Sequence, residues 1–454
     1  MFIRCVFNNL YSFGRETEFN MFPAPRFTRL KHHCYPREDI ELLKLGSIYG
    51  ANGAGKSNLI KALDLLKGVV VNGQIPSPLY LKRVKHFHSL KTPTIMAIEF
   101  ISNSNAYLYA LEIGDSSVLR EELYVSGLGK KEDQLVFERT TSKTGTITLK
   151  FFASFTESNE GKALKSILEK NLIKPHKTAL KIIAGLDDPA LQHIANAYYW
   201  IHYKFIIITP DKRPITLTHQ IDVDNEFHQF VEDTMCSLDI GIKEVFTTKK
   251  PLEEVFGKNN RTEIERIRQE IETDPMSIAG LLNEDGEVLI FVKEGDEIIG
   301  KQIQTKHTTA EGELVTFAIS EESDGTRRLM EFLTVFFDIM TSDETYFVDE
   351  LERSIHPLLI KEFVKKFSQD STSKGQLIFT THESNLLSQE IFRQDEIWFA
   401  EKDQAGNTDL YPLSEFKEHN TKDIQKGYLT GRYGSIPFLS NFKDLNWNSY
   451  DFKK

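Results

Sequence analysis

A glycine-rich segment at residues 50–57 has residue types and spacing that suit phosphate binding. It reads Gly-Ala-Asn-Gly-Ala-Gly-Lys-Ser and fits the pattern G-x-x-x-x-G-K-[ST]. Its glycines let backbone N–H groups face phosphates, its lysine can reach the β- and γ-phosphates, and its serine hydroxyl can bind Mg²⁺. An apolar run at residues 45–49 precedes it, and helical spacing follows at 57–66. The residues that we expect to bind ATP are Gly50, Asn52, Gly53, Ala54, Gly55, Lys56, Ser57 and Asn58.

Two adjacent carboxylates, Asp349 and Glu350, follow an apolar run at residues 345–348 that has the character of a buried strand. A carboxylate at the end of such a strand can hold Mg²⁺ through water, and its neighbour can orient or deprotonate an attacking water. The ordinary alternative is a solvated acidic turn. Because the phosphate-binding loop is present, we expect Asp349 and Ser57 to hold Mg²⁺ and Glu350 to be catalytic.

His382 lies just past a second buried-type run, residues 376–380. A histidine at a strand end is usually structural. Here it follows the acidic pair by one strand, so we expect it to hydrogen-bond the γ-phosphate and to detect its presence.

A fourth motif, Ser323-Asp324-Gly325-Thr326, precedes a helical pattern at residues 327–340. Small and polar residues at a helix N-terminus can form an anion site, but they also form an ordinary N-cap. The local pattern does not separate these two interpretations. The order along the chain favours the anion site, because the phosphate loop comes first, then this motif, then the acidic pair and then the histidine.

These motifs need a sheet and helices to position them. Residues 1–154 are mostly strand-like, and they contain the phosphate loop and several short alternating segments. Residues 155–310 have mainly helical periodicity and end in a hairpin, so we expect an insertion. Residues 311–454 return to strands that alternate with helices, which is typical of a parallel sheet. The expected fold class is α/β.

The composition is that of a globular protein. The chain has 454 residues, 40% hydrophobic and 27% charged, and a formal net charge of −11. This charge argues against binding DNA by overall field, although it allows a local basic groove. Three scattered cysteines, the lack of a signal-peptide pattern and the lack of a 20-residue apolar run favour a cytoplasmic protein without membrane spans.

The order of the four motifs resembles that of ABC-type ATPases, and among them the SMC-like and "overcoming lysogenization defect"-like branch. Residues 50–57 resemble its Walker A motif, 322–326 its signature motif, 347–350 its Walker B motif and 381–382 its switch histidine. The opening residues 7–13 and the later residues 431–437 also resemble bacterial phage-defence members. The ATPase subunits of PARIS systems are the most similar, with Septu-type and other abortive-infection ATPases as alternatives.

This resemblance implies an ATPase head with an antiparallel β subdomain. Two such heads hold ATP between them, so Ser323 and Gly325 of one copy would contact the γ-phosphate bound by another. It also implies assembly into a homo-oligomer, with a larger ring such as a hexamer as one form. The expected function is an ATP-hydrolysing sensor and scaffold that holds a toxic Toprim-type nuclease until a phage protein triggers its release. Too little sequence follows residue 437 for a nuclease domain, so we expect a separate effector protein.

Two other functions stay open. One is an SMC-like DNA repair or recombination ATPase, although the predicted insertion lacks coiled-coil arms and a zinc hook. The other is the motor subunit of an ABC transporter, against which the large insertion and the SMC-like signature motif count. The position of the family's Q-loop glutamine is not identified, because Gln74 follows the phosphate loop too closely.

Overall fold

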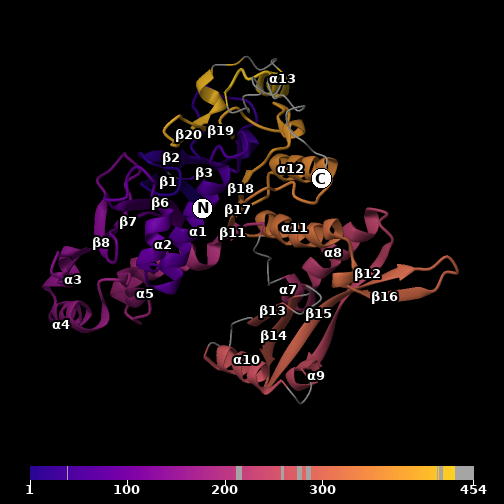
Figure 1. Ribbon diagram of the computed structural model, residues 1–454, viewed down its shortest axis with the longest axis horizontal. Coiled ribbons are helices and arrows are strands. Elements are labelled where there is room, and N and C mark those ends of the chain that lie inside the picture. The colour runs from indigo at the N-terminus through magenta and orange to yellow at the C-terminus, as the bar shows by residue number, and fades with distance from the viewer. Residues whose placement is uncertain are drawn as a thin grey trace, which may run out of the picture. The chain divides into compact units, whose positions relative to one another are not determined.

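The computed structural model describes most of the chain as two compact units (Figure 1). The first unit contains residues 1–207, 343–351 and the part from 364 onward, and the second contains residues 208–342 and 352–363. The described residues are 1–37, 39–210, 217–256, 260–273, 279–282, 288–416, 418 and 423–434.

A six-stranded sheet in the first unit carries the predicted nucleotide motifs. Its order is β11-β17-β18-β5-β19-β20. In this sheet β17 pairs in parallel with β18, β18 with β5 and β5 with β19, whereas β20 pairs antiparallel with β19. Strands β5, β17 and β18 are buried along their whole length, as expected for parallel strands covered on both faces. The predicted parallel sheet is therefore confirmed. The strands are β5 (Leu45–Tyr49), β11 (Phe205–Ile208), β17 (Thr345–Val348), β18 (Gln376–Thr380), β19 (Ile397–Lys402) and β20 (Thr408–Pro412).

A seven-stranded antiparallel sheet forms the rest of the strand-rich part of this unit. Its order is β10-β9-β8-β7-β6-β1-β2, so β2 lies at one edge. Alternating burial along β7 and β10 matches the alternating pattern in the sequence. The predicted antiparallel subdomain is confirmed. The strands are β1 (Phe2–Asn8), β2 (Thr17–Asn20), β6 (Thr94–Ser102), β7 (Asn105–Ile113), β8 (Val118–Val125), β9 (Gln134–Thr141) and β10 (Ile147–Phe151), and a small hairpin joins β3 (Cys34–Pro36) to β4 (Glu41–Leu43).

Aromatic side chains join the two sheets of the first unit. The ring of Phe2 on β1 meets Phe347 on β17 edge-on, with 5.0 Å between centroids. Phe19 on β2 lies 4.9 Å from the ring of Trp398 on β19. All four rings are at most 5% exposed. Burying residues of this size contributes roughly 1.5–3 kcal/mol each, so this contact fixes the antiparallel sheet against the sheet that carries the motifs.

Helices complete the first unit. Helix α1 (Lys56–Asn72) buries an apolar face that includes Leu59, Leu63 and Leu66, and it ends at Gly73 in the left-handed conformation. The other helices are α2 (Pro78–Val84), α3 (Ala153–Glu157), α4 (Asn159–Ile167), α5 (Ala179–Ala184), α6 (Gln192–Tyr199) and α13 (Ile424–Leu429).

The second unit contains a five-stranded sheet, of which the sequence predicted only one hairpin. Strands β12, β15, β14 and β13 pair in that order, and β16 also pairs with β15. The hairpin predicted at residues 287–292 and 297–304 is confirmed, with β14 and β15 joined at residues 295–296, although position 287 lies outside the described residues. The elements are α7 (Leu217–Val223), α8 (Asn225–Ser237), β12 (Ile242–Pro251), α9 (Leu252–Phe256), α10 (Arg261–Thr273), β13 (Ala279–Leu282), β14 (Val288–Glu294), β15 (Glu297–Thr308), β16 (Leu314–Ala318) and α11 (Asp324–Thr341).

The prediction that residues 155–310 are mainly helical is therefore wrong for β12 and β13, whereas α10 and the terminal hairpin agree with it. Strand β12 has lysines and glutamate among its apolar residues, and its extended form depends on a nine-pair ladder with β15, whose residues lie 48–65 positions later in the chain. The compact units also divide near residue 207, not at residue 155. Helix α12 (Pro357–Gln369) contributes residues to both units.

Among the described residues, no helix has both the length and the apolar character needed to cross a membrane.

Candidate nucleotide-binding site

The glycine-rich loop runs from β5 into α1, as predicted. Gly53 and Gly55 have φ values of 80° and 111°, which favour glycine. At Gly55 a second constraint applies, because a Cβ atom there would lie 2.1 Å from Thr408 Oγ1. The loop therefore needs glycine at position 55 for both its conformation and its space. Gly55 also caps α1, whose N-terminal N–H groups can bind anions.

Lys56 directs its ammonium group back over the loop. Its Nζ donates hydrogen bonds to the carbonyl oxygens of Gly50 and Ala51, at 2.8 and 3.3 Å. The side chain of His382 reaches the same point, since its Nδ1 lies 3.5 Å from Lys56 Nζ. Lys56 is 5% exposed, whereas His382 is exposed. The structure thus brings together two residues that the sequence placed in one site.

Ser57 and Asp349 also meet. Ser57 Oγ donates a 3.1 Å hydrogen bond to Asp349 Oδ1, which lies at the end of β17. The neighbouring strand, β18, ends at Thr380, whose Oγ1 donates to the same carboxylate oxygen at 2.5 Å. Asp349 is 4% exposed. A buried carboxylate is held in one orientation by two hydroxyl groups from two other elements.

The backbone turns sharply at Glu350. Its φ is 53°, which is uncommon for a residue with a side chain. The Glu350 N–H donates to Thr380 Oγ1 at 2.9 Å, and the Leu351 N–H donates to Thr380 O at 3.1 Å. These two bonds hold the turn. A strained backbone supported in this way is typical of functional sites.

The oxygen atoms at this point suit Mg²⁺. A serine hydroxyl and a carboxylate are hard ligands, and Mg²⁺ usually takes one or two protein oxygens while phosphates and waters supply the rest. No cluster of three or more histidine, cysteine or acidic residues that could hold a metal occurs among the described residues. Ser57 and Asp349 therefore fit a Mg²⁺ that arrives with a nucleotide, and they do not form an all-protein metal cage.

Ser323 begins α11 in the second unit. Its Oγ accepts a hydrogen bond of 3.1 Å from the Thr326 N–H, which is an N-cap bond, and the Ser323 residue is exposed. The preceding Glu322 is anchored, because its Oε1 accepts from Thr305 Oγ1 at 2.5 Å and faces His307 Nε2 at 2.7 Å. The loop is thus both an ordinary cap and an exposed helix N-terminus that a nucleotide could reach.

Gly325 lies against the segment that follows the acidic pair. A Cβ atom at Gly325 would lie 2.9 Å from the carbonyl oxygen of Ser354. Both residues belong to the second unit, and Ser354 has a φ of 62°. A side chain at position 325 would have to displace backbone, so a glycine is needed for this close approach.

Comparison with known proteins identifies the family. Residues 47–144 and 236–388 match a family model described as "AAA domain, putative AbiEii toxin, Type IV TA system". This match covers more than half of the chain and includes the phosphate loop, Ser323, the acidic pair and His382. The chain belongs to this AAA-domain family. No curated protein matches the chain.

Solved structures of SMC head domains are distantly similar to this AAA-domain protein. The SMC head bound to the C-winged helix domain of ScpA has a TM-score of 0.38 and 13% identity, covering 90% of this chain and 97% of that one. The SMC head domain from Thermotoga maritima has a TM-score of 0.33 and 13% identity, with 90% and 98% covered. The SMC head with an extended coiled coil, bound to the C-terminal domain of ScpA derived from Pyrococcus furiosus, has a TM-score of 0.39 and 13% identity, with 95% and 98% covered. No residue role follows from similarity at this level.

Three residues of the site were not predicted from the sequence. Thr380 supports both carboxylate residues, and the only sequence signal is its polar side chain at the end of an apolar strand. Ser12 accepts a 2.7 Å hydrogen bond from Asn58 Nδ2, and Thr408 Oγ1 lies 2.7 Å from Ser12 Oγ and 2.8 Å from Ala54 O. Asn58 and Ala54 are thereby fixed, while Asn52 is exposed on the loop.

Of residues 431–437, which the resemblance also used, 435–437 lie outside the described residues.

Proposed function

We propose that the protein binds and hydrolyses ATP at the site formed by the phosphate loop and the ends of β17 and β18. The observation that carries this proposal is the hydrogen bond between Ser57 Oγ and Asp349 Oδ1. It brings the hydroxyl after the loop lysine to a buried carboxylate at a strand end, which is the pair that P-loop ATPases use for Mg²⁺. Lys56 beside the loop carbonyls supplies the positive charge.

Each residue has a proposed role. Lys56 would bind the β- and γ-phosphates, and Mg²⁺ on Ser57 and Asp349 would neutralise phosphate charge when bound. Glu350 would accept a proton from the water that attacks the γ-phosphorus, while the bond from that phosphorus to the β–γ bridging oxygen breaks and ADP leaves. His382, whose Nδ1 lies near Lys56 Nζ, would hydrogen-bond the γ-phosphate and detect its loss.

A second copy of the chain would complete the site. Ser323 is exposed at the start of an 18-residue helix, and its neighbour Glu322 is held by two side chains. A fixed, exposed helix N-terminus suits a γ-phosphate presented by another subunit. ATP would then hold two copies together, and its hydrolysis would release them, within a homo-oligomer or a larger ring such as a hexamer.

The family description supports the biological role that we propose. It names an AbiEii toxin of a type IV toxin–antitoxin system, which supports a role in abortive infection. We place the protein as an ATP-controlled sensor and scaffold in a PARIS-type anti-phage system in the cytoplasm, where it would hold a Toprim-type nuclease until a phage protein binds. An ATP-timed assembly suits such a role, because a trigger needs only to favour the open state.

Lys56→Ala tests the proposal. It should reduce ATP turnover by at least about 100-fold, since a central electrostatic contact to the transferred phosphate is lost. Lys162→Ala, which removes an exposed lysine on α4, is the matched control and should keep wild-type turnover. Protection of bacteria against phage should be lost with Lys56→Ala and kept with Lys162→Ala. Wild-type turnover in Lys56→Ala would refute the site, and full protection would refute the role.

A further inference from the structure

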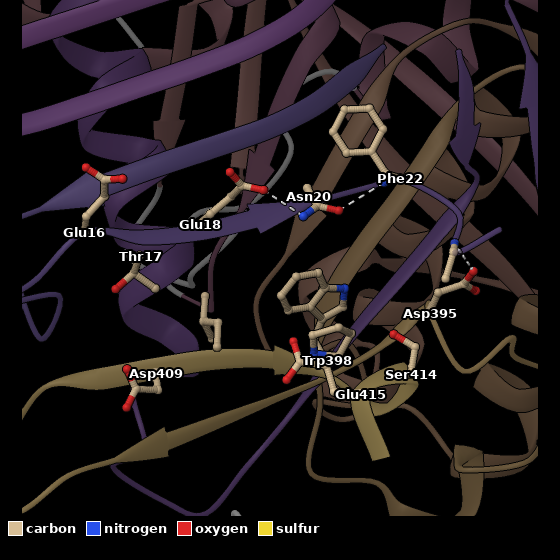
Figure 2. Close-up of a pocket in the computed structure, with 13 residues that line it drawn as sticks. Glu16, Thr17, Glu18, Asn20, Phe22, Asp395, Trp398, Asp409, Ser414 and Glu415 are labelled. Carbon is tan, nitrogen blue, oxygen red and sulfur yellow. Dashed lines mark hydrogen bonds between the residues drawn. The ribbon is translucent and has the colours of Figure 1, made fainter. Parts of the chain in front are cut away.

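A pocket lies on the first unit between the edge strands of its two sheets. Residues 16–20 of β2 and the loop before it form one side, and residues 409–412 of β20 form the other (Figure 2). Its volume is about 420 Å³. Both strands are the last in their sheets, so neither has a further strand paired to its outer side among the described residues. Edges of this kind leave main-chain groups available to a ligand.

The pocket is lined by more carboxylates than the neighbouring arginines neutralise. Asp395 pairs with Arg393, and Asp409 accepts from Arg15 Nε at 3.0 Å. Three more carboxylates line it: Glu16, Glu18 and Glu415. Glu18 lies 3.4 Å from Arg4, which Glu99 also binds, while Glu16 and Glu415 have no ion pair with any described residue. Among the described residues, nothing neutralises these two carboxylates, which lie on opposite sides of the pocket.

Trp398 supplies an independent sign of a ligand. It lines the pocket and is 5% exposed, yet its indole N–H has no hydrogen-bond acceptor among the described residues. Figure 2 shows its ring in the middle of the lining residues, between β2 and β20. An indole N–H can only donate, and a buried donor without an acceptor costs roughly 1–3 kcal/mol. A ligand that offers an acceptor as well as positive charge would therefore suit both features of this pocket.

These two requirements identify the chemistry of the ligand. A polyamine or a free cation matches the carboxylates but offers no acceptor, because ammonium groups only donate. A peptide offers both, since its backbone carbonyl can accept from Trp398 while a lysine or arginine side chain meets Glu16 and Glu415. We propose that this pocket binds a basic, extended segment of a partner protein.

Binding of a short peptide can test this proposal on the full chain. The probe is a capped peptide of alternating glycine and lysine, with a glycine–glutamate peptide and spermidine as comparisons. Titration calorimetry measures affinity, and the Trp398 indole N–H signal in ¹⁵N NMR reports the acceptor. Trp398→Phe identifies that signal, because the chain has three tryptophans.

The proposal expects saturable binding of the basic peptide alone, with a shift of the Trp398 signal. Glu16→Gln with Glu415→Gln should weaken binding about fivefold, the amount expected for two partly exposed charges. Glu311→Gln with Glu313→Gln removes the same charge from exposed residues of the second unit and should leave affinity unchanged. The proposal would be overturned if both double variants weakened peptide binding equally, if spermidine bound as tightly as the basic peptide, or if the Trp398 signal did not shift when the peptide was added.

Discussion

Ser57 Oγ and Asp349 Oδ1 lie 3.1 Å apart although 292 positions separate the two residues in the chain. The contact exists because β5 and β17 both pair in parallel with β18, so their carboxyl ends meet at one edge of the sheet. Ligands of open parallel sheets bind at this edge. The order of the strands in the sheet therefore sets the position of the proposed site. The polar residues of the motifs meet there because they follow neighbouring strands.

Asp349→Asn should separate magnesium binding from nucleotide contact. Asparagine keeps the size of the side chain and can still accept from Ser57 and Thr380, but it removes the charge that would hold Mg²⁺. ATP turnover should fall at least about 100-fold, and the dependence of ATP affinity on Mg²⁺ should weaken. Calorimetric titration with and without Mg²⁺ measures this, with Asp115→Asn as the control at an exposed site. An unchanged magnesium dependence would mean that Asp349 does not serve the metal.

Thr380→Val should damage the site without removing any residue proposed to touch ATP. The Asp349 carboxylate and the Glu350 N–H both lose a buried partner, which costs roughly 1–3 kcal/mol for each group left unpaired. Thermal unfolding should show lower stability, and turnover should fall. Thr380→Ser keeps the hydroxyl and should restore both. If the valine variant hydrolyses ATP like the wild type, the hydroxyl does not support the acidic pair.

Glu322→Gln should affect turnover through Ser323 while leaving ATP affinity unchanged. The carboxylate binds Thr305 and His307, and glutamine keeps its size but loses its charge. The loop that presents Ser323 should then be less rigid, with turnover reduced about threefold to tenfold for the loss of a charged hydrogen bond. Glu321→Gln, at the exposed neighbouring residue, is the control. A change in ATP affinity with unchanged turnover would contradict this role.

The buried Glu121 should make stability depend on pH. Burial raises the pKa of this carboxyl above its usual 4.5, although Arg139 and the N–H groups of Ala179 and Leu180 oppose the shift. A pKa that is higher in the folded state means that the folded protein binds more protons. This contribution to stability is therefore full below about pH 4.5 and is lost as pH rises through the folded pKa. The free energy of unfolding of Glu121→Gln, measured with urea, should be lower than that of the wild type and should change less with pH in this range. If it changes with pH as much as in the wild type, Glu121 is not the source of the pH dependence.

The sequence predicted the parts of the site that are local. Residues 50–57 form their loop with residues close in the chain, and the carboxylates and His382 stand directly at the ends of apolar strands, so pattern and spacing were enough. Thr380, Ser12 and Thr408 were missed because each acts on a residue far away in the chain, such as Asn58 or Ala54. Strand β12 was missed for the same reason, since its lysine-containing sequence is extended only when paired with β15.

In the assembly that we propose, each ATP site takes Lys56 from one copy and Ser323 from another. Lys56→Ala and Ser323→Arg proteins should each be inactive, because every site lacks one half. Mixing equal amounts and measuring ATP hydrolysis tests the claim most directly. Random assembly makes about one quarter of the sites from two intact halves, so the mixture should recover about one quarter of the wild-type rate. A mixture as inactive as its components would contradict a site shared between subunits.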